Sequence, residues 1–136
     1  MTKSTRESKT RLSETIGFGE ARRTSSEAVL PNLELVLTQP RVAPGETLNF
    51  EVRFSWPGPG DVRLVELLVH LAGEDRNFAR ATETAHGTSI SEQQEWIVPV
   101  KLQIPGDGTP GSWQLSARVL LEGGAVFISQ ASVEVG

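Results

Sequence analysis

Three segments of the chain carry an apolar residue at every second position, and this alternation constrains the fold more than any other feature. The segments are Thr47–Trp56, Trp96–Ile104 and Trp113–Leu121. Successive side chains of a β-strand point to opposite faces of the sheet, so a period of two predicts a strand with one buried face. Each of these segments is therefore predicted to be a long strand that faces a hydrophobic core.

Four further segments are predicted to be strands with a weaker pattern: Leu33–Leu37, Val62–Leu71, Asn77–Thr84 and Ala125–Val135. Turn sequences rich in Gly and Pro separate the strands. Pro44-Gly45 is suited to a type II turn, and Gly123-Gly124 is suited to a hairpin. Seven short strands joined in this way predict an all-β, seven-stranded antiparallel sandwich of immunoglobulin-like (Ig-like) type, with a barrel as the alternative.

Residues 1–31 differ in composition from the rest of the chain. They are rich in Ser, Thr, Arg and Glu, with six basic and four acidic side chains, whereas residues 32–136 hold seven basic and thirteen acidic ones. So few apolar residues cannot offset the entropy lost on ordering. We therefore expect a flexible basic N-terminal arm over residues 1–31 and an Ig-like domain over residues 32–136.

Two short sequences resemble those of bacterial and phage Ig-like domains. The first, Pro44-Gly45-Glu46-Thr47-Leu48, is similar to the start of their second strand. The second begins at Ile104-Pro105 and continues with Pro110-Gly111-Ser112-Trp113-Gln114-Leu115, which resembles the step before their sixth strand. The same step occurs in the carbohydrate-binding domain fused to certain O-antigen exporters. The resemblance covers residues 33–135 and implies a fold, not a ligand.

Several classes of function find no support in the residues. The chain has no cysteine, no nucleophile elbow, no phosphate loop and only two histidines, His70 and His86. We therefore expect no enzyme activity, no metal and no cofactor. The acidic domain argues against binding nucleic acid, and no long apolar run indicates a membrane span. No apolar segment follows the basic N-terminus, so we expect a cytoplasmic or virion-associated protein without a signal peptide.

Apolar residues on the outer face of predicted strands suggest a contact surface. Leu64, Leu68 and Leu120 occupy the alternate strand positions whose side chains are predicted to point outward. Exposed apolar patches usually mark contacts. The arm offers further anchors to a neighbouring copy or another protein: Leu12, Ile16 and Phe18, with Arg22 and Arg23 as charges. The expected function is a structural or assembly protein, an Ig-like platform tied by its arm into a larger complex such as a virion decoration or tail component.

The alternative is a carbohydrate- or ligand-binding module. Trp56 and Trp113 lie at predicted strand ends, where an indole ring at a loop tip could stack on a sugar. Both also have the parity of core residues, as Trp96 does. Exposure of these rings would distinguish the two hypotheses.

Overall fold

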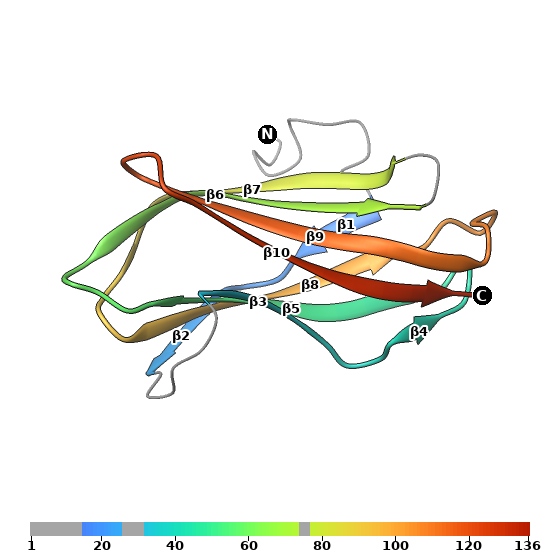
Figure 1. Ribbon diagram of the computed structural model, residues 1–136, viewed down its shortest axis with the longest axis horizontal. Helices are drawn as coiled ribbons and strands as arrows, with labels where there is room; N and C mark the ends of the chain where they lie inside the picture. Colours follow the sequence, from blue (N-terminus) through green and yellow to red (C-terminus); the bar gives the residue numbers. More distant parts are fainter. Residues whose placement is uncertain (1–14, 26–31, 74–76) are drawn as a thin grey trace.

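The alternating segments form the long strands of two packed β-sheets (Figure 1). The structure is a computed structural model, and it describes residues 15–25, 32–73 and 77–136. The first sheet has the order β1-β8-β5-β3, with β2 also paired to β8. Its strands are β1 (Ile16–Phe18), β2 (Arg22–Ser25), β3 (Leu33–Leu37), β5 (Thr47–Trp56) and β8 (Gln94–Gln103).

The second sheet has the order β4-β10-β9-β6-β7. Its strands are β4 (Arg41–Val42), β6 (Val62–Ala72), β7 (Asn77–Ile90), β9 (Gly111–Leu121) and β10 (Val126–Val135). All pairs in both sheets are antiparallel except β4 with β10, which is parallel. The described residues thus form a β-sandwich, but with ten strands instead of the predicted seven.

The three additional strands are too short to show a period in the sequence. β1, β2 and β4 contain three, four and two residues, and each pairs with the side of a longer strand. The seven longer strands correspond to the seven predicted segments. Their inward faces build one continuous core in which Phe54, Leu48 and Leu102 are fully buried.

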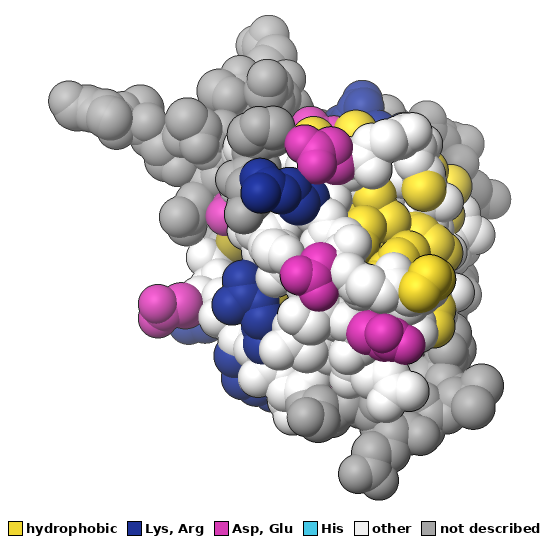
Figure 2. Space-filling view, turned by 90° about the vertical axis from the view of Figure 1, so that its left-hand side faces the viewer, with side chains coloured by type: hydrophobic (Ala, Val, Ile, Leu, Met, Phe, Trp, Pro, Cys, Tyr) yellow, Lys and Arg dark blue, Asp and Glu magenta, His cyan; other side chains and the backbone are white. Residues whose placement is uncertain are grey.

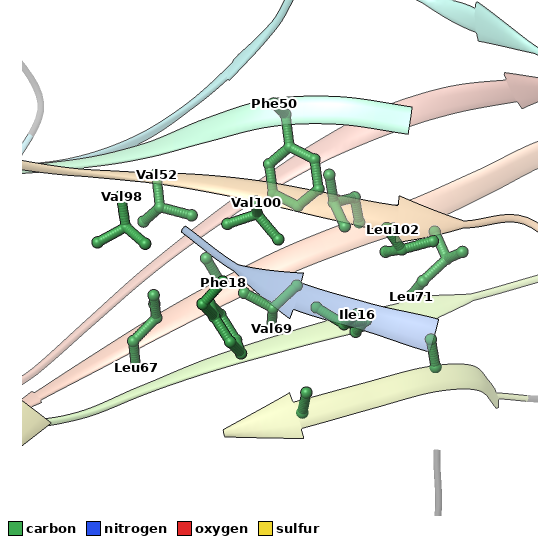
Figure 3. Close-up of a cluster of buried hydrophobic side chains, with 14 of the residues drawn as sticks. Ile16, Phe18, Phe50, Val52, Leu67, Val69, Leu71, Val98, Val100 and Leu102 are labelled. Atoms are coloured by element: carbon green, nitrogen blue, oxygen red, sulfur yellow. The ribbon is translucent and has the colours of Figure 1, made fainter. Parts of the chain in front are cut away.

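For the described residues 15–25, strand β1 corrects the prediction of a flexible N-terminal arm over residues 1–31. Ile16 and Phe18 are 5% and 8% exposed and belong to the core. Figure 3 shows both side chains pointing into the space between the sheets, among valines and leucines of β6 and β8. The described part of the predicted arm, residues 15–25, is therefore built into the sandwich, and its two apolar residues are not anchors for a neighbour.

The pairing of β1 and β2 with β8 is interrupted opposite Pro99. Phe18 pairs with Val100 and Arg22 pairs with Ile97. The segment between the two short strands is therefore one residue longer than the part of β8 that lies opposite it. Proline has no N–H to donate to a neighbouring strand, which explains why a continuous ladder does not form here. The Pro99 carbonyl still accepts a hydrogen bond of 2.7 Å from the Gly19 N–H.

A β-bulge in β6 changes the face on which Leu64 lies. The register of β6 with both β7 and β9 shifts between Leu64 and Glu66. Val65 is the extra residue, so Leu64 points inward although Leu68 points outward. Leu64 is fully buried, and the prediction that it belongs to an exposed surface is wrong.

The turns agree with their sequences. Gly45 has a φ of 85°, and the Glu46 N–H donates to the Ala43 carbonyl at 3.0 Å, as the predicted type II turn requires. Gly123 and Gly124 both have positive φ values in the β9–β10 turn. Strand β10 pairs with β9 without a register shift.

Candidate functional site

The outer face of the second sheet carries a group of apolar side chains arranged in two rows. In one row, Glu66 of β6 pairs with Leu120 of β9, which pairs with Val126 of β10. In the next row, Leu68 pairs with Arg118, and Arg118 pairs with Ile128. We call these six residues the outer patch.

The outer patch includes the most exposed large apolar residues of the described chain. Ile128 is 63% exposed and Val126 is 45% exposed, whereas Leu68 and Leu120 are half-buried. A sheet face that meets only water is normally polar. The patch therefore has the composition of a contact surface.

Two of the three predicted surface leucines are in the outer patch, and two of its apolar residues were missed. Leu68 and Leu120 lie where the parity of their strands placed them, and Leu64 lies in the core. Counting back in steps of two from Val133, which is buried, places Phe127 on the inward face, and Val126 and Ile128 therefore on the outward face.

The charges of the outer patch alternate with its leucines. Glu66 and Leu68 are two residues apart on β6, and they lie beside Leu120 and Arg118 on β9. The four side chains form a square in which the two leucines occupy one diagonal and the two charges occupy the other. Beside this square, a hollow of about 290 Å³ opens between Leu68, His70, Arg118 and Ile128.

Hydrophobic and charged side chains are also separated at one end of the sandwich. Figure 2 shows the end where β5 passes into β6 and β9 passes into β10. Hydrophobic side chains gather on one side of this face, and basic and acidic side chains occupy most of the other side. The largest apolar area at this end thus lies on one side.

The two arginines predicted to contact a neighbour bind the chain's own body. Arg22 Nη2 donates to Glu51 Oε2 at 3.2 Å, and Arg23 Nε donates to the Ser89 carbonyl at 3.1 Å. Arg53 also contacts Glu51, through Nε at 3.1 Å and Nη2 at 3.0 Å. These contacts fix β2 against the sandwich. Leu12, the remaining predicted anchor, lies outside the described residues.

The arginines hold Glu51 in its charged form. Hydrogen bonds from Arg53, opposed by burial and reinforced by Arg22, lower the pKa of Glu51 from its ordinary value of 4.5. A carboxyl group with a lowered pKa stabilises the folded state above the pKa of the unfolded chain. That stabilisation is lost as the pH falls through the folded pKa.

This loss predicts how Glu51→Gln responds to acid. Between about pH 6 and about pH 3, we expect the wild type to lose more free energy of unfolding than the variant. The difference should be below about 1 kcal/mol, because the ion pairs are partly exposed. Urea unfolding at the two pH values measures it, and equal losses in the two proteins would contradict the assignment.

The two tryptophans of the glycan hypothesis lie at opposite ends of the sandwich. Trp56 is the last residue of β5, and the loop after it leads into the start of β6. That start lies beside the end of β9, because Leu64 pairs with Leu121. Trp113 lies near the start of β9, is 3% exposed, and donates from Nε1 to the Thr109 carbonyl. Trp56 is half-buried and donates to the Gly60 carbonyl. The two rings therefore cannot form one binding surface.

The described ranges contain neither a cluster of metal-ligating side chains nor a helix suited to spanning a membrane. No group of three or more His, Cys, Asp or Glu residues in 15–25, 32–73 and 77–136 is placed to hold a metal ion. In the same part of the chain, no helix has the length and apolar character to cross a membrane. His86 lies within β7.

No protein-family model matches the sequence, and no curated protein matches it either. Solved structures do match the fold. The macrocyclisation catalyst AvmM of alchivemycin A biosynthesis has a TM-score of 0.58 with this chain, at 13% identity over 79% of this chain and 90% of AvmM. The CARDB domain of a Pyrococcus furiosus protein, solved in complex with di-metal ions, has a TM-score of 0.54 at 16% identity, over 82% of this chain and 95% of that domain.

The sporulation control protein Spo0M from Bacillus subtilis also matches, with a TM-score of 0.54 and 16% identity. The match covers 86% of this chain but only 49% of Spo0M, so the chain spans about half of that protein. At such identities the likeness shows the fold, which is an all-β sandwich. The differing roles of these proteins leave the function to be argued from this chain's own residues.

Proposed function

We propose that the chain is a non-enzymatic assembly module, an Ig-like platform that pairs with a second copy through the outer patch. The arrangement of the long strands supports the Ig-like part of this proposal. Strands β3, β5 and β8 share one sheet, β6, β9 and β10 share the other, and β4 runs parallel to β10. Ig-like domains divide their strands between two sheets in a corresponding way.

The observation that carries the proposal is the exposure of Val126 and Ile128 beside two half-buried leucines. Burying these side chains against a partner would contribute about 25 cal/mol for each Å² of apolar surface removed from water. Interfaces of this kind are apolar at the centre and charged at the rim. Glu66 and Arg118 provide both signs of charge next to the apolar residues.

The square of leucines and charges is complementary to itself, which favours a second copy over a different protein. A two-fold axis that runs along the diagonal from Leu68 to Leu120 exchanges the positions of Glu66 and Arg118. Each arginine then faces the glutamate of the other copy, and each leucine faces its own equivalent. Isologous dimers need this kind of self-complementary surface.

Exchanging charges across the square tests the proposal. We expect the wild type to form dimers on light scattering at increasing concentration. Arg118→Glu should weaken the dimer at least tenfold, about 1.4 kcal/mol, because it places like charges opposite each other. The double variant Glu66→Arg with Arg118→Glu restores opposite charges and should restore the dimer.

Gln114→Glu is the matched control. It introduces the same glutamate side chain at an exposed outward position of β9, two rows away from Arg118 and outside the square. We expect its dimer to match that of the wild type. A wild type that stays monomeric at all concentrations, or a double variant as weak as Arg118→Glu, would overturn the proposed pairing.

A further inference from the structure

A second hollow lies over the outer face of the first sheet, on the opposite side of the sandwich from the outer patch. Its volume is about 720 Å³, within the usual range for small-molecule sites. It exists because the outward position of β1 is Gly17, which has no side chain to fill it, while Gly19, just after β1, packs against Pro99. Pro99 lies at the adjacent outward position of β8 and provides a flat, rigid floor.

The lining of this hollow is mainly apolar. Val36 of β3 and the Pro99 ring face it, and the core residues Phe18, Phe50 and Val100 contribute to its walls. A Cβ atom built on Gly17 would meet nothing within 4 Å, so the space above β1 is open. A flat apolar ring can lie in this space and bury one face against Pro99 and Gly17.

One cation of the hollow forms no ion pair within the described part of the chain. On one side, Arg53 pairs with Glu51 at 3.0 Å, and Glu51 also pairs with Arg22 at 3.2 Å. Lys101, on the other side, forms no ion pair with any carboxylate of the described residues. An anionic group of a ligand would therefore find its counter-charge at Lys101, next to the apolar floor.

The backbone around the hollow argues against an extended peptide as the ligand. Strands β5 and β8, which form its floor, are each paired on both sides. Their N–H and C=O groups are used in the sheet, so the floor offers no free ladder to a peptide strand. We infer that the hollow binds a small molecule with a flat apolar ring system and one carboxylate.

The probe is 2-naphthoate, with the neutral 2-naphthamide as its matched control ligand. Both are titrated into the full chain while backbone amide shifts are followed by NMR. We expect 2-naphthoate to shift the amides of Gly17 and Lys101 and to bind at least tenfold more tightly than the amide. Absence of binding at millimolar concentration, or equal binding of both probes, would overturn the inference.

Two variants locate the site. Gly17→Leu fills the hollow from an outward position with open space around it, so it should abolish binding without unfolding the chain. Lys101→Met should reduce the affinity for 2-naphthoate to that for 2-naphthamide. Gly106→Leu, at another glycine with nothing within 4 Å, should leave binding unchanged. If Gly17→Leu stays folded and binds like the wild type, the site is not here.

Discussion

Replacing Phe18 by alanine will lower the free energy of unfolding by about 3 kcal/mol, as expected for a buried aromatic residue. The side chain is 8% exposed and lies between the two sheets (Figure 3). Its removal leaves a cavity between β1 and β6 that the rigid strands cannot close. Urea unfolding followed by tryptophan fluorescence measures the change, because Trp96 and Trp113 are buried in the native state.

Gly17→Ala is the control for this experiment. Gly17 is the neighbouring residue on the same strand, but it points outward and has nothing within 4 Å of a new Cβ. We expect no loss of stability there, since alanine in a strand is at least as favourable as glycine. If Phe18→Ala were as harmless as Gly17→Ala, residues 16–18 would be an arm on the surface, contrary to the structure.

Replacing Leu64 by alanine will cost about 3 kcal/mol, whereas Leu68→Ala will cost less than about 1 kcal/mol. The two leucines are four residues apart on one strand, so an unbroken period of two would give them the same environment. The bulge between Leu64 and Glu66 separates them, with Leu64 fully buried and Leu68 half-buried on the outer face.

The pair of variants measures the bulge directly. Both changes remove the same atoms, so helix or strand propensity and side-chain volume cancel in the comparison. Thermal or urea unfolding of the two proteins under one condition provides the difference. Equal destabilisation would show that the two side chains share an environment and that β6 runs without a bulge.

The period of two was sufficient to predict the long strands because each of them is buried on one face over many residues. Thr47–Trp56 was predicted with the bounds that the structure shows, and Trp113–Leu121 differs from β9 only at its start. Strand β1 could not be predicted in this way. It offers only Ile16 and Phe18, and two apolar residues separated by a glycine also occur in irregular segments.

The candidate site was only partly visible for a similar reason. Alternation predicts the face of a side chain only while every residue of the strand is paired. Val65 is an extra, unpaired residue, so the prediction fails for Leu64. The hollow at Gly17 had no signal at all in the sequence. Its shape comes from residues of β1, β3, β5 and β8 that are far apart in the chain and meet only in the folded sheet.

The interruption opposite Pro99 has a consequence for how copies of the chain can meet. It divides what would be one outer strand of the first sheet into β1 and β2, of three and four residues, and the opposite edge is β3, of five. Long free edges invite strand-to-strand aggregation, and short or broken ones prevent it. The first sheet thus offers a neighbouring chain little template on which to extend its strands. Its outer face is the surface that is left open to selective contact.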